Sequence, residues 1–183
     1  MKKVIILDCG PSLEEVSREF GQSPEWVISA LEDQSCEFDW IKVYAGQTME
    51  NSSEDAWIIT GSPRSVYEEE DWMLRLEVNI RDAAKRKRPI LGICFGHQLI
   101  AKSFGGTVEK NPNGWELVSY SISLTEHGKY SPLFKDIKDD LIVYESHQDS
   151  VTRMPDGSVE LAYNKKCVQA CQLFDTLYSV QFH

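Results

Sequence analysis

The sequence lacks any long apolar run. No stretch approaches the roughly 18 consecutive apolar residues that a membrane-spanning helix needs. The first apolar stretch, Val4 to Leu7, is too short for the core of a secretory signal, and we interpret it as a strand. Neither a membrane partner nor export is therefore predicted.

Positive charge is scarce as well. The 183 residues include 19 Lys and Arg against 29 Asp and Glu, which gives a formal net charge of −10. Such a chain has no net positive field that would attract phosphate groups. Nucleic acids and anionic membrane surfaces are therefore not expected among its partners.

Cysteine is too sparse and too irregularly spaced for a disulfide framework or a zinc cluster. The chain has five cysteines, an odd number. Cys167 and Cys171 lie close together, but no His or Cys pair follows nearby in the sequence to complete a tetrahedral site. We predict free thiols, no bound metal, no cofactor and a reducing, cytoplasmic location.

Internal repeats and low-complexity linkers are absent too, so one domain covering residues 1–183 is expected. Hydrophobic residues make up 42% of the chain, enough for one full core. Strand and helix patterns alternate in the first half, whereas the second half is mostly strand. This order predicts an α/β fold, with a central, mostly parallel sheet, helices on both faces and a β-rich C-terminal extension.

Short apolar runs and turn residues mark the expected elements. Ser12 with Glu15, and Ser23 followed by Pro24, have the pattern of helix starts. Residues 71–85 are expected to form a helix that buries Trp72, Leu74, Leu76, Ile80 and Ala83. The expected strands cover residues 4–7, 38–44, 56–60, 90–93, 107–109, 117–124, 141–146, 159–163, 168–173 and 177–182.

One stretch joins a strand directly to a helix through a cysteine. The strand Ile90 to Ile93 is followed by Cys94 and, with no linker, by an amphipathic run from His97 to Phe104. Gly92 and Gly96 flank the cysteine where side chains would crowd a sharp turn, which is the pattern of a nucleophile elbow. A helix N-terminus is expected to lower the thiol pKa and so to raise the thiolate fraction. The alternative is a buried structural cysteine.

A cysteine nucleophile needs a basic partner and donors for an oxyanion. Ligands bind at the carboxyl ends of parallel strands, where the elbow and Gly61-Ser62 are both expected. Of the four histidines, we interpret His97 as structural and His127 as solvated. His147 and His183 both end strands, and position alone does not choose between them.

Two motifs resemble the signatures of class I, triad-type glutamine amidotransferases. Residues 92–98, Gly-Ile-Cys-Phe-Gly-His-Gln, resemble their G-x-C-x-G-x-Q elbow, and residues 178–183, Tyr-Ser-Val-Gln-Phe-His, resemble their strand that ends in His-Pro-Glu. Residues 59–63 are similar to the family's glycine-rich oxyanion strand, and residues 146–151 to a segment of the GMP-synthase-type branch. The similarity extends through essentially the whole chain and is greatest to free-standing GMP-synthase-like proteins, which include γ-glutamyl peptide hydrolases.

The resemblance implies a flavodoxin-like three-layer α/β/α fold and a set of functional residues. Cys94 would attack the side-chain amide of glutamine or of another γ-glutamyl compound, forming a thioester and releasing ammonia or an amine. His183 would carry the proton. Backbone N–H groups of Gly61, Ser62 and Phe95 would hold the oxyanion. The residues expected to hold the substrate are Gln98, Gly114, Trp115 and His147.

Two positions depart from the family pattern. The residue before Pro63 is usually glycine and here is Ser62, so the oxyanion strand is expected to flip or to sit differently. The sequence ends at His183 without the Pro-Glu that should follow, and we expect the natural chain to continue. In the family that Glu orients the histidine, and losing an orienting acid lowers the activity of a triad without abolishing it.

Three functions are open at this point. The first is a glutamine amidotransferase that passes ammonia to a separate synthetase polypeptide. The second is a stand-alone hydrolase of γ-glutamyl amides or peptides, in which water accepts the acyl group. The third is a catalytically silent, flavodoxin-like binding module. Flavin itself is disfavoured, because no loop offers a Ser/Thr-Gly run suited to a phosphate.

Overall fold

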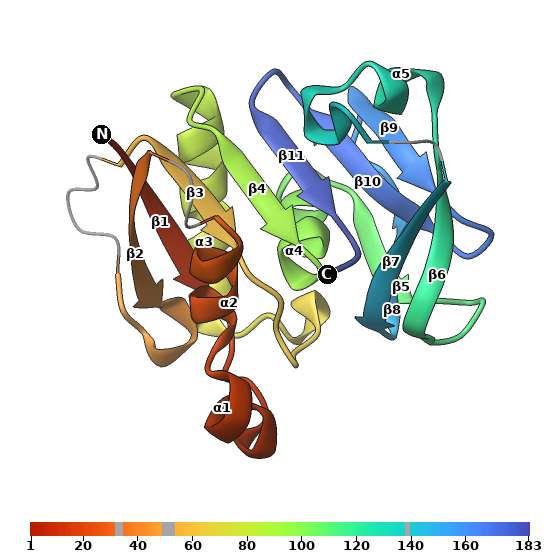
Figure 1. Cartoon of the computed structure of the whole chain (residues 1–183). Helices are drawn as coiled ribbons and strands as arrows, with labels where there is room; N and C mark the ends of the chain where they lie inside the picture. Colours follow the sequence, from red (N-terminus) through yellow and green to blue (C-terminus); the bar gives the residue numbers. More distant parts are fainter. Residues whose placement is uncertain (32–34, 49–53, 138–139) are drawn as a thin grey trace.

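Five parallel strands form one half of the central sheet in the computed structural model, which describes residues 1–31, 35–48, 54–137 and 140–183. Their spatial order is β2-β1-β3-β4-β11 (Figure 1), and each is paired in parallel with its neighbour. The short apolar segments of β1, β3 and β4 are typical of parallel strands covered on both faces, whereas every residue of the edge strand β2 is half-buried or exposed. The strands are β1 (Lys2–Asp8), β2 (Cys36–Lys42), β3 (Ala56–Ile59), β4 (Ile90–Ile93) and β11 (Leu177–Val180).

Antiparallel strands extend the same sheet beyond β11, in the order β10-β9-β6-β7. The β-rich extension predicted from the sequence is therefore continuous with the parallel half. A separate two-stranded sheet pairs β5 with β8, and β8 was not predicted because only Gln148 separates it from β7. These strands are β5 (Thr107–Lys110), β6 (Glu116–Leu124), β7 (Asp140–His147), β8 (Asp149–Arg153), β9 (Ser158–Tyr163) and β10 (Val168–Leu173).

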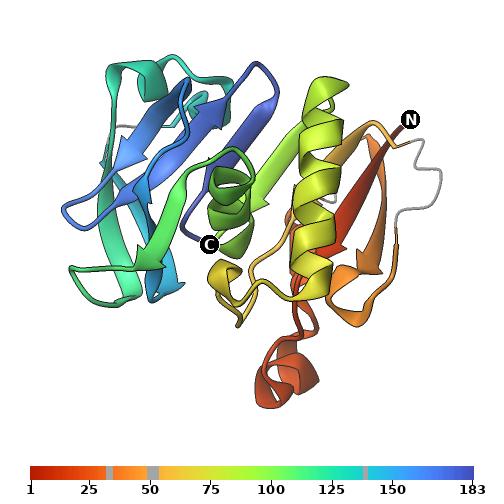
Figure 2. The ribbon, with the colours of Figure 1, turned by 180° about the vertical axis from the view of Figure 1, so that it is seen from behind.

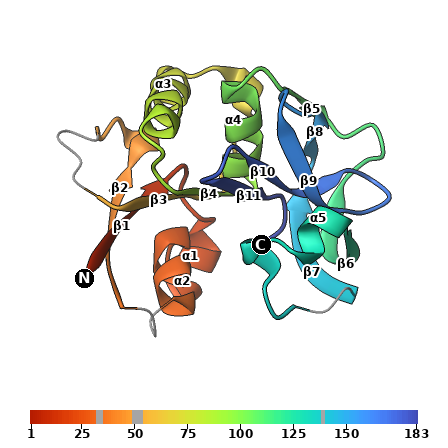
Figure 3. The same cartoon turned by 90° about the horizontal axis from the view of Figure 1, so that it is seen from above.

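Helices cover both faces of the parallel half, which confirms the three-layer α/β/α prediction. One face carries α3 and α4 (Figure 2), and the other carries α1 and α2 (Figure 3). Side chains of β1 alternate between two cores, with Ile5 and Leu7 on the α3 and α4 side and Val4 and Ile6 on the α2 side. The helices are α1 (Glu14–Phe20), α2 (Ser23–Ala30), α3 (Asp71–Lys85), α4 (Phe95–Ser103) and α5 (Glu126–Lys129), with 3-10 turns η1 (Val43–Ala45), η2 (Val66–Glu68) and η3 (Pro132–Phe134).

Helix α3 has the predicted bounds but a slightly different buried face. Trp72, Leu76, Ile80 and Ala83 are buried as expected, whereas 43% of Leu74 is exposed. Each helical residue advances by about 100° around the axis, so a side chain two positions after Trp72 points away from the core. Met73 takes that place in the core and is fully buried.

The predicted serine caps of the first two helices are wrong. Helix α1 begins after Leu13, and the Ser12 hydroxyl contacts the Ser23 hydroxyl at 3.5 Å instead of capping the helix. The N-cap of α2 is Gln22, whose backbone N–H donates to the Glu25 carboxylate at 2.6 Å. A carboxylate three residues into the helix thus satisfies the backbone donor that precedes it.

The neighbouring strands β3, β4 and β11 end at one edge of the sheet. Gly92 of β4 is paired with Ile59 of β3 on one side and with Ser179 of β11 on the other. Because the three strands are parallel, the residues that follow them meet at the edge where α/β sheets bind ligands. Within the described ranges, no helix is long and apolar enough to cross a membrane.

Candidate active site

Cys94 lies at a strained turn between β4 and α4. Its φ of +52° and ψ of −102° are rare for a residue that is not glycine. The backbone N–H of Cys94 donates to the Val180 carbonyl of β11 at 2.8 Å, which fixes the turn against the neighbouring strand. Strain of this kind costs on the order of 1–3 kcal/mol and clusters at functional sites. The elbow predicted from the sequence therefore has the backbone geometry that the pattern requires.

The glycines on either side of Cys94 allow two close backbone approaches. A Cβ added to Gly92 would lie 2.6 Å from the Gly96 carbonyl, so the helix could not begin directly above the strand. A Cβ added to Gly96 would lie 2.5 Å from the Ile59 carbonyl of β3. Both positions therefore need glycine for packing, although neither has a positive φ.

The fold brings His183 to Cys94 through Gly61. A Cβ added to Gly61 would lie 3.2 Å from His183 Cε1 and 3.7 Å from Cys94 Cβ. The backbone N–H of His183 donates to the Tyr144 carbonyl of β7 at 2.9 Å, which holds the end of the described chain in place. Three residues that follow three neighbouring strands thus meet at one point, as Figure 1 shows for the C-terminus beside the tip of β4.

His183 is kept in its neutral form. Burial of the imidazole lowers the pKa of His183 below its ordinary value of 6.5, and the nearby His147 lowers this pKa further. The residue as a whole remains exposed at the molecular surface. A neutral imidazole at neutral pH is able to accept a proton.

The thiol pKa of Cys94 differs from the sequence-based expectation. Burial raises the pKa of Cys94 to about 12, and the negative charges of Glu145 and Asp149 act in the same direction. The backbone N–H of Phe95 and the side chain of Gln181 lower this pKa, but by less. The prediction that the helix N-terminus makes the thiol acidic is therefore wrong, because loss of hydration outweighs the helix terminus.

The candidate oxyanion donors lie on two elements. The Phe95 N–H is close enough to the Cys94 sulfur to affect its pKa, and Gly61 lies on the opposite side, after β3. Ser62, which replaces the family's usual glycine, is half-buried, and its hydroxyl accepts a bond from the Arg64 N–H at 3.2 Å. The serine side chain is thus engaged in its own loop.

Gln98 is buried beneath the elbow. Its amide Nε2 donates to the Asp149 carbonyl at 3.0 Å and to Gln181 Oε1 at 3.1 Å. The carboxylate of Asp149 accepts bonds from the Ser65 hydroxyl at 2.5 Å and from the Tyr67 hydroxyl at 3.0 Å. Sequence reasoning missed Asp149 and Gln181 as links between β8, β11 and the loop after β3. The only signal was their place inside the two segments that resemble the family.

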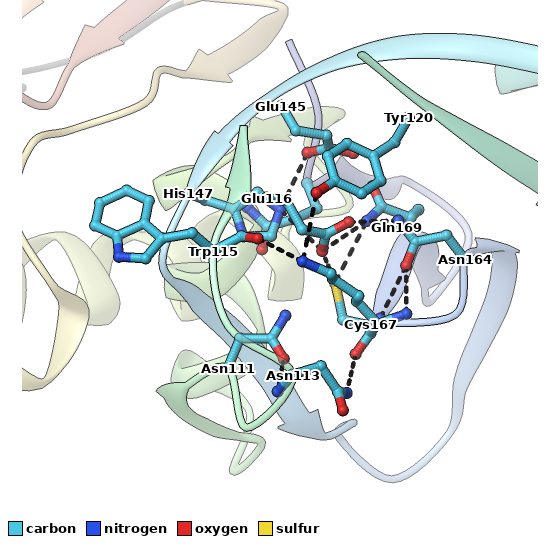
Figure 4. A network of polar contacts seen from close by, with 12 residues as sticks. Asn111, Asn113, Trp115, Glu116, Tyr120, Glu145, His147, Asn164, Cys167 and Gln169 are labelled. Carbon is cyan, nitrogen blue, oxygen red and sulfur yellow. Dashed lines mark hydrogen bonds and ion pairs between the residues drawn. The ribbon is translucent and has the colours of Figure 1, made fainter. Parts of the chain in front are cut away.

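The other predicted substrate residues lie in or beside the antiparallel half. His147 is buried, and Glu116 and Glu145 lie against its Nε2 atom. Gly114 has a φ of +79° in the turn before β6, and 52% of Trp115 is exposed, with its indole pointing away from the buried polar side chains (Figure 4). Within the part of the chain that the structure describes, Trp115 forms no hydrogen bond with Cys94 or His183.

The two remaining histidines have the environments expected from the sequence. His97 is fully buried, its Nδ1 lies 2.8 Å from the Ser179 hydroxyl, and burial lowers its pKa to about 3. His127 is exposed. All five cysteines are free thiols.

Comparison with known proteins agrees with this arrangement. The family model "Glutamine amidotransferase class-I" matches residues 18–183. Gamma-glutamyl peptidase 4 of Arabidopsis thaliana is 27% identical over 188 residues, covering 100% of this chain and 75% of that protein. The glutamine-hydrolyzing GMP synthase of Lactobacillus delbrueckii subsp. bulgaricus is 33% identical over 187 residues, covering 99% of this chain and 32% of that protein. The chain thus spans about a third of the length of this second relative.

Solved structures share the fold. A glutamine amidotransferase from Thermotoga maritima matches with a TM-score of 0.84 and 20% identity, over 100% of this chain and 75% of that one. A glutamine amidotransferase from Methylobacillus flagellatus matches with a TM-score of 0.80 and 23% identity, over 100% of this chain and 69% of that one. The family match, the curated relatives and the shared fold lead to one conclusion: the chain belongs to the class I glutamine amidotransferases, enzymes of cysteine-dependent amide hydrolysis.

Proposed function

We propose that this protein hydrolyses the side-chain amide of glutamine or of another γ-glutamyl compound, with Cys94 as nucleophile and His183 as proton carrier. The observation that supports this most directly is that a Cβ added to Gly61 would lie within 4 Å of both His183 and Cys94, at the ends of three parallel strands. The raised thiol pKa makes the histidine necessary, because Cys94 stays protonated at neutral pH unless a base removes the proton during attack.

The reaction proceeds in two halves. The imidazole of His183 takes the thiol proton as Cys94 Sγ bonds to the amide carbon, and the carbonyl electron pair moves onto oxygen. When the C–N bond breaks, His183 gives the proton to the leaving nitrogen, which departs as ammonia or an amine and leaves a thioester. Water then attacks the thioester carbon and gives a proton to His183. The C–S bond breaks, His183 returns the proton to the departing sulfur, and the thiol is regenerated as the glutamyl group leaves with a free γ-carboxylate.

We assign the oxyanion to the backbone N–H groups of Phe95 and of Gly61 or Ser62. Loss of one such donor typically costs about 3 kcal/mol of transition-state stabilisation. Placing Gln98, Gly114, Trp115 and His147 around the glutamyl part of the substrate remains a proposal, supported by their match to the family's positions. So does the assignment of residues 1–183 to a single domain.

The test is hydrolysis of glutamine by the full chain, followed as ammonia release. The proposal expects turnover that Cys94→Ala reduces by about 10⁶-fold, the size of loss found when a protease nucleophile is removed. Cys171→Ser is the matched control, since Cys171 is also buried but lies against Ser179. Equal activity of the wild type and Cys94→Ala would contradict the proposed nucleophile.

Experiment can distinguish two roles for this reaction: supply of ammonia to a separate synthetase, and hydrolysis of γ-glutamyl peptides. The GMP synthase relative hydrolyses glutamine, and the Arabidopsis relative is named a γ-glutamyl peptidase. If this chain supplies ammonia to a separate synthetase, cell extract should stimulate its glutaminase activity. If it acts on γ-glutamyl peptides, peptide cleavage should exceed glutamine hydrolysis and need no partner. The free thiols support a reducing, cytoplasmic location for either activity.

A further inference from the structure

A second cluster of reactive side chains lies in the antiparallel half of the sheet. Glu116 begins β6, His147 ends β7, and Cys167 directly precedes β10 (Figure 4). One potential ligand atom from each residue lies within 4.8 Å of the other two. Glu116 and His147 are buried, and Cys167 is half-buried at the outer side of the group. Glu116 and Cys167 have no part in the proposed reaction, and His147 enters it only as a residue placed around the glutamyl part of the substrate.

The hydrogen bonding of His147 turns one ring nitrogen toward this cluster. His147 Nδ1 lies 2.9 Å from the Asp149 carbonyl, which can only accept, so Nδ1 carries the proton. A backbone carbonyl on one imidazole nitrogen is the usual second partner of a metal-bound histidine. The other nitrogen, Nε2, is buried and has no hydrogen-bond partner among the described residues.

Carboxylates face that nitrogen from two sides. Glu116 Oε2 is 3.4 Å from His147 Nε2, and Glu145 Oε2 is 3.0 Å from it. Both Glu145 oxygens are buried without a hydrogen-bond donor among the described residues. The Cys167 sulfur is 3.1 Å from the same Glu116 oxygen. Two carboxylates and a thiol thus converge on one imidazole nitrogen, an arrangement that a divalent cation would neutralise.

The spacing of these atoms suits zinc. Metal–ligand bonds of about 2.1 Å to nitrogen and oxygen place tetrahedral donors about 3.4 Å apart. The Nε2 to Oε2 distance between His147 and Glu116 is 3.4 Å. A sulfur, a nitrogen and an oxygen donor together favour zinc over calcium or magnesium, which prefer oxygen alone. We propose that Glu116, His147 and Cys167 bind a zinc ion, with Glu145 as the nearest further donor.

The surrounding loop holds Cys167 in position for this role. Asn164 Oδ1 accepts the backbone N–H groups of Lys166 and Cys167 at 2.8 and 3.0 Å. Asn164 Nδ2 donates to the other oxygen of Glu116 at 2.5 Å, so Glu116 is oriented from outside the group. A bound ion would join β6, β7 and the start of β10. The sequence analysis predicted no bound metal, because the three proposed ligands are far apart in the chain and no local spacing connects them.

Zinc content of the full chain tests the proposal without any assay of activity. The protein is incubated with zinc sulfate and desalted, and the zinc that remains per chain is measured by inductively coupled plasma mass spectrometry. The proposal expects about one zinc per chain, and zinc should raise the melting temperature above that of the chelator-treated protein. A chain that retains no zinc after desalting would overturn it.

Cobalt substitution identifies the ligands. Co²⁺-loaded protein should show sulfur-to-cobalt charge-transfer absorption. Cys167→Ser should abolish this absorption, and Cys36→Ser, a change at a half-buried cysteine of β2, should leave it intact. Glu116→Gln should weaken Co²⁺ binding by about tenfold or more while retaining the absorption at saturation. If Cys167→Ser does not fold, the affinity of Glu116→Gln for Co²⁺ decides whether the ion binds at this cluster. Absorption that survives in Cys167→Ser, or unchanged affinity in Glu116→Gln, would show that the ion binds elsewhere.

Discussion

The two halves of the sheet use buried polar groups in different ways. The parallel half, β2-β1-β3-β4-β11, buries mostly aliphatic side chains, with Ser179 of β11 as a buried polar exception, and the candidate reacting groups follow the ends of its strands. The antiparallel half, β10-β9-β6-β7, buries Glu116, Glu145 and Gln169 within its strands. The parallel half therefore supplies a rigid edge for the reacting groups. The antiparallel half supplies charge beside that edge.

The two halves are joined at a few identifiable contacts. β11 is parallel to β4 on one side and antiparallel to β10 on the other. His97 of α4 packs against Ser179 of β11 at this seam. Asp149 begins β8, which follows β7 of the antiparallel half after Gln148, and its carboxylate accepts bonds from Ser65 and from Tyr67 of η2, in the segment after β3. Substitutions at these contacts, and at the glycines of the parallel half, test whether the two halves contribute differently to stability and to activity.

The largest effect is expected where the parallel half packs most closely. In Gly96→Ala the new Cβ would meet the Ile59 carbonyl at 2.5 Å, and overpacking of this kind typically costs about 1–3 kcal/mol of unfolding free energy. Gly157→Ala, in a turn of the antiparallel half, has no atom within 4 Å of its Cβ but a φ of +78°, so about 1 kcal/mol is expected. Urea unfolding measures both. A larger loss of unfolding free energy in Gly157→Ala than in Gly96→Ala would contradict the expected difference between the two halves.

Gly61→Ala should reduce activity more than stability. Its Cβ would lie 3.2 Å from His183 Cε1, so the imidazole must move by a few tenths of an ångström, while the backbone φ is an ordinary one. We expect a loss of kcat of about tenfold, since small displacements of reacting groups are costly. Circular dichroism and glutaminase kinetics distinguish the two effects. Unchanged kcat would mean that Gly61 does not set the position of His183.

Acid should destabilise the fold through His97, which joins α4 to β11. Its pKa is about 3 in the folded protein and near its ordinary 6.5 in the unfolded chain. Between these values the unfolded chain binds a proton that the folded protein does not, so stability falls as the pH falls from 6.5 toward 3. The loss is at most about 1.4 kcal/mol per pH unit. His97→Gln should lose less stability between pH 7 and 5, and an equal loss in both proteins would assign the effect elsewhere.

The smallest effect is expected from the charge of Asp149 on the thiol. The negative charge of Asp149 raises the pKa of Cys94, so Asp149→Asn should lower that pKa by less than about one unit. Alkylation of Cys94 followed against pH would then have its midpoint at lower pH than in the wild type. Glu68→Gln, which changes an exposed carboxylate paired with Arg64, serves as the control. A shift to higher pH would contradict the electrostatic account.

Local pattern predicted much of the fold but little of the contacts between distant strands. The spacing of Gly92, Cys94 and Gly96 predicted the elbow because a strand, a turn and a helix are adjacent in the chain. The pairing of β4 with β11 depends on residues far apart in sequence, so position left His147 and His183 as equal candidates and only the family resemblance chose His183. The thiol pKa depends on burial and on Glu145, which no local pattern contains. The Glu116 cluster was missed for the same reason.

The central claim is that Cys94 and His183 act as one unit, and labelling of the thiol measures this most directly. A glutamine analogue carrying a diazo-ketone should alkylate Cys94 in the wild type, giving a single mass increase that peptide mapping assigns to that residue. In His183→Asn the rate should fall by about 100-fold or more, because the buried thiol keeps its proton without the imidazole. Labelling of Cys94 at the wild-type rate in His183→Asn would contradict the account.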